Sequence, residues 1–321
     1  RDAQESRGLG DVYKRQWWQL LIIVFAAIIF LYYPIGGWMM NKIDTTTDYE
    51  INTPPSQSAT VEMMSFLIKR EVSDKIWTPN LPFVFPSYVL DNMPNFQLGL
   101  MSAVSNIASS FAAKVDQTIA PEKELPLKTA AELLKYPGTI WMFSPQNKLT
   151  PVPSANTQYK KARKRLVAYN RSLREGGSVF YKSPGDLAYF LQRMSKDLWL
   201  SNEKLEAHIR EHSSDWVDNR SDDLFYYQQG KIYGYYLLMK ALSYDYKDII
   251  LANDIYQPWT QMVKALEEAV VLSPAVVRNG EPDSTLAPNH LSSIGYYSLK
   301  AALISQNMMC KLTLSAAQGK Q

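Results

Sequence analysis

The chain has 321 residues, with 34 Lys and Arg against 31 Asp and Glu and a net charge of +3. Hydrophobic residues make up 46% and charged residues 20%, an ordinary globular composition that argues against disorder. The near-neutral charge gives no global case for nucleic-acid binding. One cysteine, Cys310, excludes an intramolecular disulfide and a cysteine-based zinc cluster, and three histidines leave little material for a histidine-rich metal site. We predict no cofactor and no nucleic-acid partner.

The first 16 residues, RDAQESRGLGDVYKRQ, have no apolar periodicity. They resemble a translated library-adapter sequence, and we expect residues 1–16 to be a non-native leader. They hold four basic and three acidic side chains, so their removal changes the net charge from +3 to +2. Lys14 and Arg15 therefore carry no weight in deciding a membrane orientation.

Residues 17–33, WWQLLIIVFAAIIFLYY, contain no charge, and Gln19 is their one strongly polar side chain. A helix continuing to residue 38 would be roughly 33 Å long, enough to cross the hydrocarbon of a bilayer. Aromatic residues that suit the two membrane interfaces stand at both ends: Trp17, Trp18, Tyr32, Tyr33 and Trp38. We predict a transmembrane anchor over residues 17–40 that contacts the lipid bilayer, broken or kinked near Pro34, Gly36 and Gly37.

Two other interpretations of this segment are weaker. A cleaved signal peptide would be followed by small residues at its cleavage site, whereas mostly bulky residues follow here. A buried core helix of a soluble domain is the remaining alternative, which the length and apolarity disfavour. On the far flank Lys42 is soon outnumbered by Asp44, Asp48 and Glu50. This asymmetry favours a cytoplasmic N-terminus and an exported body.

The next part of the chain combines polar, helical and proline-rich segments. Residues 41–58 are polar and Thr-rich, which predicts a flexible linker. Apolar spacing predicts a short amphipathic helix over 61–72, a longer one over 96–115 and a short one over 129–135. Four prolines make 77–94 irregular, and we expect Phe83, Phe85, Tyr88 and Leu90 to pack it. A loop is expected over 138–156.

From residue 157 onward the pattern is helical almost throughout. Helices are predicted over 157–175, 184–200, 202–217, 222–246, 255–272 and 287–312, the second with Ser183 as its N-cap and Pro184 at its first position. Strand signals are few. The predicted fold class is mainly α: a single N-terminal transmembrane helix, a helical-bundle-like body over 59–312 and a disordered tail over 313–321.

Three segments carry a resemblance to a known family. They are LDNMPNFQLG (residues 90–99), DDLFYYQQGKIYGYYLLMKAL (222–242) and the SP…NG…LAPNHLS pattern (273–292). In order and spacing the chain resembles, over roughly residues 17–312, the uncharacterised bacterial membrane-protein family catalogued as domain of unknown function 2333. The resemblance implies an N-terminal membrane helix and a mostly helical body, and it implies no activity. With it, we expect a bacterial inner-membrane protein with a periplasmic body.

The sharpest catalytic pattern is HIREH, residues 208–212, which fits the H-x-x-E-H motif of inverted zinc metallopeptidases. His208 and His212 would share a helix face as zinc ligands, with Glu211 as general base. A third ligand would come from Glu267, Glu268 or Glu281. The surrounding segment is highly charged, which favours a solvated helix face over a catalytic pocket. Asp222–Asp223 and Glu267–Glu268 are adjacent pairs, so within each pair the side chains diverge on a helix and form no acid–base dyad.

Two further surfaces are candidates for binding. A basic run on the 157–175 helix contains Lys160, Lys161, Arg163, Lys164, Arg165, Arg171 and Arg174. It suits anionic lipid or an acidic partner, or it is a solvated face balanced by acidic helices. The 222–246 helix and its flanks carry Tyr226, Tyr227, Tyr233, Tyr235, Tyr236, Tyr244 and Tyr246. These tyrosines suit core packing or a partner or glycan groove, and Gly230 and Gly234 would let another helix approach closely.

The leading hypothesis is a membrane-anchored, non-enzymatic envelope protein that acts as a scaffold or binding module for an envelope protein or cell-wall glycan. Its surface would include Lys160, Lys161, Arg163, Lys164, Tyr226, Tyr227 and Tyr235. The alternatives are an envelope hydrolase acting through His208, Glu211 and His212, and a glycan-binding module using the tyrosine-rich helix.

Overall fold

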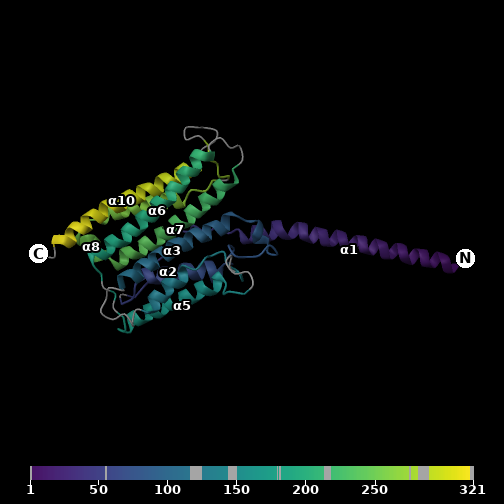
Figure 1. The fold of residues 1–321 in the computed structure, drawn as a ribbon, viewed down its shortest axis with the longest axis horizontal. Coiled ribbons are helices and arrows are strands. Elements are labelled where there is room, and N and C mark those ends of the chain that lie inside the picture. Colours follow the sequence, from purple (N-terminus) through teal and green to yellow (C-terminus); the bar gives the residue numbers. More distant parts are fainter. Residues whose placement is uncertain are drawn as a thin grey trace. The chain divides into compact units, whose positions relative to one another are not determined.

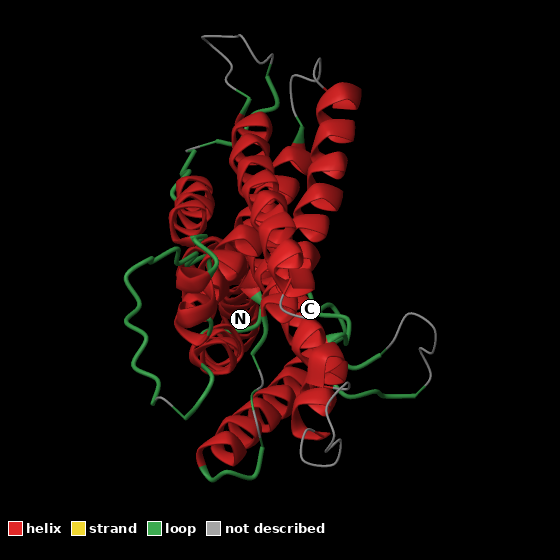
Figure 2. Ribbon diagram, turned by 90° about the vertical axis from the view of Figure 1, so that its left-hand side faces the viewer, coloured by secondary structure: helices red, strands yellow, loops and turns green. Residues whose placement is uncertain are grey.

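The computed structural model describes residues 2–54, 56–115, 125–143, 150–178, 180, 182–212, 218–274, 276–280 and 289–318. Over these residues the chain forms ten α-helices, a π-helical turn (η1), a 3-10 turn (η2) and no β-strand (Figure 2). The predicted mainly α fold is confirmed. The chain divides into an N-terminal unit, Arg1–Lys42 with Leu81–Leu90, and a body, Ile43–Asn80 with Asp91–Gln321.

The N-terminal unit contains one long helix, α1 (Asp2–Met40), drawn in purple in Figure 1. Its Gln16–Met40 part has a mean hydropathy of 2.3 and is long and apolar enough to cross a membrane. Only 6% of the apolar 18-residue stretch within it is buried. α1 runs through Pro34, and Asn41 N still donates to Gly37 O at 2.8 Å beyond it. The predicted break near Pro34 is therefore wrong. Proline has no backbone N–H, so the helix loses one hydrogen bond there and still continues.

The 3-10 turn η2 (Pro86–Val89) packs against the end of α1. A Cβ at Gly36 would lie 2.7 Å from Pro86 Cβ, and one at Gly37 would touch Leu90. Gly36 and Gly37 thus give residues 81–90 room to approach the helix. The sequence pattern predicts a helix break or kink at these glycines instead.

The body contains the remaining helices. They are α2 (Ala59–Lys69), continued by η1 (Arg70–Asp74), α3 (Asn92–Val115), α4 (Leu125–Leu134), α5 (Ala155–Arg174), α6 (Pro184–His212), α7 (Asn219–Asp245), α8 (Lys247–Ala252), α9 (Tyr256–Val270) and α10 (His290–Gln318). Within the body α7 packs against α3, α6 against α10, and α5 against α2 (Figure 1). α5 also packs against α4.

Two predicted helix boundaries in the body are wrong. The helices expected over 184–200 and 202–217 form one helix, α6. Ser201 and Asn202, at the predicted boundary, face inward. Lys231 Nζ donates to Ser201 Oγ at 2.7 Å, and Asn202 Nδ2 donates to Ser298 Oγ at 2.9 Å. At the other end α10 continues to Gln318, so the disordered tail predicted from residue 313 is helical through residue 318.

α7 lies at the centre of the body. Every residue from 228 to 239 is buried. A Cβ at Gly230 would lie 2.7 Å from the carbonyl carbon of Phe96, and a Cβ at Gly99 would lie 2.8 Å from that of Tyr227. The backbones of α3 and α7 therefore touch through glycines of both helices. This confirms the close approach predicted for Gly230.

The segment 43–58, predicted as a flexible linker, is fastened to the body instead. Ile43, Tyr49 and Ile51 pack against the hydrophobic core. Tyr233 Oη donates to the carbonyl of Thr46 at 2.7 Å, and Lys240 Nζ donates to that of Thr47 at 2.9 Å. The prediction is wrong here because side chains of α7, far away in the sequence, supply donors to the segment's backbone.

The N-terminus of α2 is capped by a residue that lies far away in the sequence. Asp245, the last residue of α7, is buried and accepts hydrogen bonds from Ser58 Oγ, Ala59 N, Thr60 N and Thr60 Oγ1 at 2.7 to 3.0 Å. A carboxylate at this place satisfies free N–H groups and complements the positive end of the helix dipole. Asp245 thereby joins the end of α7 to the start of α2.

Candidate functional site

The residues of the predicted anchor lie on the surface of α1. Trp17, Trp18, Tyr32 and Trp38 are exposed, and Tyr33 is half-buried. Every residue from 17 to 31 is exposed, although most are large and apolar. A soluble protein rarely leaves a continuous apolar surface of this kind uncovered.

The HIREH segment forms a structural contact at the end of α6. His208 is buried, and its Nε2 atom lies 2.6 Å from Asp218 Oδ2. Asp218 is the N-cap of α7, where its other oxygen accepts from Arg220 N and Ser221 N. Burial raises the pKa of Asp218, but hydrogen bonds from Ser221 and His208 outweigh it and lower that pKa overall. His208 and Asp218 thus tie the end of α6 to the start of α7.

Of the other zinc candidates, only His212 is described close to His208. Glu211 is exposed, and the ring of His212 lies 4.6 Å from that of His208. Glu267 accepts a hydrogen bond from Tyr236 Oη, and Glu268 pairs with Lys300 at 3.3 Å; Glu281 lies outside the described residues. Within the described ranges, no group of three or more His, Cys, Asp or Glu side chains could hold a metal ion. The geometry gives the hydrolase hypothesis no support.

The tyrosine-rich helix is the core helix α7 rather than a surface. Tyr233, Tyr235, Tyr236 and Tyr246 are buried, whereas Tyr226 and Tyr227 are half-buried and Tyr244 is exposed. Tyr235 Oη donates to Asp197 Oδ2 at 2.7 Å inside the body. The prediction that Tyr235 belongs to a partner surface is therefore wrong, because α6 covers its hydroxyl.

The basic run lies on α5 with its cations turned outward. The buried face consists of Tyr159, Ala162, Leu166, Tyr169 and Leu173. The exposed face carries Lys160, Lys161, Lys164, Arg165, Arg171 and Arg174, while Arg163 is half-buried. Arg174 pairs with Glu175 at 3.7 Å, and within the described part of the chain none of the other exposed cations forms an ion pair. We call these six residues the α5 basic face.

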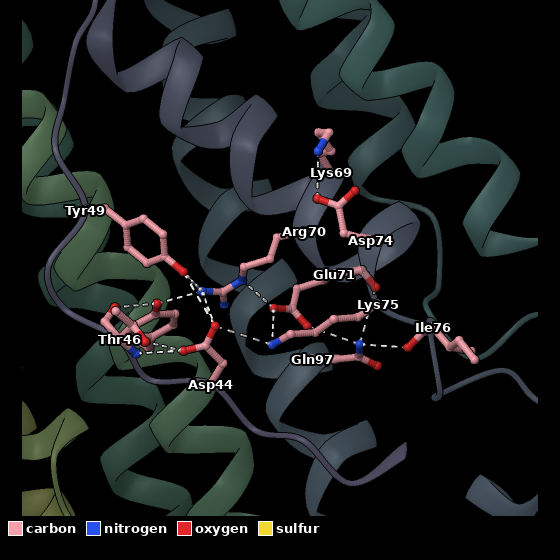
Figure 3. A network of polar contacts seen from close by, with 11 residues as sticks. Asp44, Thr46, Tyr49, Lys69, Arg70, Glu71, Asp74, Lys75, Ile76 and Gln97 are labelled. Atoms are coloured by element: carbon pink, nitrogen blue, oxygen red, sulfur yellow. Dashed lines mark hydrogen bonds and ion pairs between the residues drawn. The ribbon is translucent and has the colours of Figure 1, made fainter. Parts of the chain in front are cut away.

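A buried polar network, which sequence reasoning missed, surrounds η1 (Figure 3). Arg70 Nε lies 2.7 Å from Glu71 Oε1, and both side chains are buried. Gln97 Nε2 donates to Glu71 Oε2 at 3.1 Å, and Arg70 Nη1 donates to Tyr233 Oη at 2.6 Å. Arg70 and Glu71 are consecutive residues of the π-helical turn, in which Lys75 N donates to Arg70 O.

Asp44 brings the 43–58 segment into contact with this network. Its Oδ2 lies 3.9 Å from both Arg70 Nη1 and Lys75 Nζ, while Thr46 donates to Oδ1. Burial raises the pKa of Asp44, but the Thr46 hydrogen bonds and the two cations lower it below its usual value. The network therefore fastens this segment through charge, in addition to the hydrogen bonds from α7.

A second missed group is a set of three carboxylates, Asp91, Asp222 and Asp223. Asn95 Nδ2 donates to Asp223 Oδ1 at 2.7 Å. With its nitrogen facing the carboxylates, Asn92 donates to Asp222 Oδ2 at 2.6 Å and to Asp91 Oδ1 at 3.1 Å. Burial, together with the charges of Asp91 and Asp223, raises the pKa of Asp222 to about 6. The third carboxylate, that of Asp91, lies directly before α3, so the adjacency of Asp222 and Asp223 in the sequence could not reveal the group of three.

Comparison with known proteins supports the resemblance over part of the chain. Residues 200–310 match the model of a family described as an uncharacterized protein conserved in bacteria, DUF2333. This range contains two of the three segments that carry the resemblance, at 222–242 and 273–292, and the segment at 90–99 lies outside it. No curated protein and no solved structure matches the chain. The predicted resemblance is confirmed over residues 200–310, and the match assigns no activity to any residue.

Proposed function

We propose that the chain is a single-pass bacterial inner-membrane protein in which α1 anchors the body. The observation that carries the proposal is the exposed apolar surface of Gln16–Met40, whose apolar 18-residue stretch is only 6% buried. Transfer of such a surface from water to hydrocarbon is strongly favourable, and a helix satisfies its own backbone hydrogen bonds in lipid. The bilayer is the environment that suits this surface.

The charges after α1 favour an exported body. Lys42 is followed by Asp44, Asp48 and Glu50, and cytoplasmic flanks of membrane helices are enriched in Lys and Arg instead. The body would then lie in the periplasm. There it acts in this proposal as a non-enzymatic scaffold or binding module.

The α5 basic face is the surface that we assign to binding. Five of its six cations have no ion-pair partner among the described residues, which leaves their charges available to an anionic partner. Such a surface attracts a polyanion through long-range electrostatics that weaken as salt rises. We infer that the body holds an acidic component of the envelope at α5.

Carbonate extraction of cell membranes tests the anchor. The full-length protein is expected to stay in the membrane pellet, and Phe25→Lys/Ile29→Lys is expected to reduce its share there because both positions are exposed in the apolar span. Gln16→Lys, at the end of the span, is the matched control. Extraction of the wild-type protein would contradict anchoring, and an inactive C-terminal alkaline phosphatase fusion would contradict the periplasmic orientation.

Site-specific photo-crosslinking in cells tests the α5 basic face. A photoreactive residue at position 164 is expected to give a discrete adduct, and Lys160→Glu/Lys161→Glu/Arg165→Glu is expected to abolish it. A photoreactive residue at position 206, exposed on α6, is the control. An adduct that survives charge reversal, or the same adduct from position 206, would remove α5 from the proposal.

A further inference from the structure

Residues 81–90, LPFVFPSYVL, form a loop that is held against the end of α1; we call it the docked loop. Tyr32 Oη donates to the carbonyl of Val84 at 3.0 Å, and Tyr33 Oη donates to the carbonyl of Phe83 at 2.8 Å. Pro86 lies over Gly36, where even a methyl group would collide with its ring. Loop and helix end therefore form one packed unit.

The docked loop points its large apolar side chains outward. Phe83 is 67% exposed, Val84 52%, Phe85 39% and Tyr88 64%. The sequence predicts that Phe83, Phe85, Tyr88 and Leu90 pack the segment, and that prediction is wrong for the three aromatic residues. Buried Pro86 and Ser87 and half-buried Leu90 face inward instead. The result is an apolar surface that continues the exposed surface of α1 within the same unit.

Several polar backbone groups of the docked loop are paired within the same unit. The carbonyls of Phe83 and Val84 accept the two tyrosine hydroxyls, Phe85 N donates to Pro82 O at 3.0 Å, and Tyr88 N donates to Phe85 O at 3.0 Å. The two prolines have no N–H to satisfy. Each paired group lowers the cost of moving the loop out of bulk water, since unpaired polar groups are what makes entry into a nonpolar medium expensive.

The hydrogen bonds also fix the depth of the loop along α1. Tyr33 lies about 24 Å along the helix from Trp17, at a rise of about 1.5 Å per residue. If Trp17 lies at one interface of a hydrocarbon layer about 30 Å thick, Tyr32 and Tyr33 lie close to the other interface. Phe83 and Val84, bonded to those tyrosines, share this depth.

We propose that the docked loop inserts Phe83, Val84, Phe85 and Tyr88 into the headgroup–acyl boundary of the leaflet on the body side. The proposal rests on the proposed membrane anchor and adds a second lipid contact to it. Aromatic and aliphatic side chains on one surface are the residue types that bind this boundary. Two contacts, the span and the docked loop, would fix the rotation of α1 about its axis and the depth of its end.

Depth-dependent fluorescence quenching tests the insertion in the full-length protein reconstituted into vesicles of phosphatidylcholine and phosphatidylglycerol. Cys310→Ser removes the one natural thiol, and single cysteines are then labelled with an environment-sensitive dye at three positions. Ile28→Cys reports on the span, Phe83→Cys on the docked loop, and Lys42→Cys on an exposed polar position of the same unit. Brominated lipids act as the quencher.

Strong quenching is expected at positions 28 and 83, each at least about twofold greater than at position 42, because only the first two lie among acyl chains. Quenching at position 28 with position 83 no different from position 42 would overturn the docked-loop proposal and leave the anchor intact. Position 28 without quenching would overturn the anchor itself, and the loop proposal with it.

Discussion

Two helices of this chain contain long apolar stretches, and they differ in what surrounds these stretches in the structure. In α1 every residue from 17 to 31 is exposed, whereas in α7 every residue from 228 to 239 is buried. α7 has glycines where α3 touches it, and its polar side chains have partners in the protein: Lys231 pairs with Asp197 at 3.0 Å, and Gln229 donates to the carbonyl of Leu272 at 2.6 Å. Residues 17–33 of α1 have neither glycine nor charge. α7 therefore carries the glycines and paired polar side chains of a helix that protein covers, and residues 17–31 of α1, which we propose to lie in lipid, carry neither.

Gly230→Ala is expected to damage the protein-covered helix most. The added methyl group would meet the backbone of α3, with Phe96 Cα at 2.9 Å, and a backbone cannot move aside as a side chain can. We expect a loss of about 3 kcal/mol in the free energy of unfolding of the body, at the upper end of overpacking effects. Urea unfolding followed by circular dichroism measures it.

The matched control is Gly185→Ala in the first turn of α6. There the nearest atom to a new Cβ is Ser183 Oγ at 3.7 Å, an ordinary contact. Its effect is expected to stay within about 0.5 kcal/mol, as for most substitutions away from special features. Equal unfolding midpoints for the two variants would show that the α3–α7 contact is looser than described.

Asp197→Asn tests the polar contacts of α7, with a smaller expected effect. Lys231 would keep the hydrogen bond to Ser201 at 2.7 Å but lose its charged partner while its ammonium group stays buried. The expected cost is about 1–3 kcal/mol in the free energy of unfolding, mainly from leaving a buried charge uncompensated. Glu206→Gln, exposed on the same helix, is the control. A cost no greater than that of the control would mean that water replaces the carboxylate at Lys231.

Local sequence patterns located most helices because their signals lie within a few residues. Ser183 and Pro184 predicted the start of α6, and Asp186 N does donate to Ser183 Oγ at 3.1 Å. The errors arise where a distant partner decides. The helix boundary predicted between residues 200 and 202 is wrong, and Ser201 and Asn202 there have partners on α7 and α10. The 43–58 segment is predicted to be flexible, but Tyr233 and Lys240 bind its carbonyls.

The same distinction holds for the candidate sites. The basic character of α5 could be predicted, because charge and helical periodicity are local. The docked loop could not, since its aromatic residues lie outward only because Tyr32 and Tyr33, about fifty residues earlier, hold its backbone. HIREH matched a motif in sequence, yet in the fold His208 Nε2 lies 2.6 Å from Asp218 Oδ2, a residue outside the motif.

The smallest expected effect concerns the start of α7, where the buried helix reaches water. The pKa of Asp222 is raised to about 6 by burial and by the charges of Asp91 and Asp223, from a usual 3.8. The folded protein therefore holds this proton more tightly than the unfolded chain. The stabilisation is fully present below about pH 4 and is lost as the pH rises through 6.

Asp222→Asn removes this titration, since the amide stays neutral at every pH. The variant should exceed the wild-type protein in free energy of unfolding by on the order of 1 kcal/mol at pH 7.5, after allowance for screening of a half-buried group, and match it near pH 4. Asp248→Asn, exposed on α8, is the control and should change the free energy of unfolding by the same amount at both pH values. A constant difference between Asp222→Asn and the wild-type protein from pH 4 to 7.5 would mean that Asp222 is hydrated in solution. In that case protein does not cover α7 at residue 222, near its start, and the contrast with α1 applies only to the interior of α7.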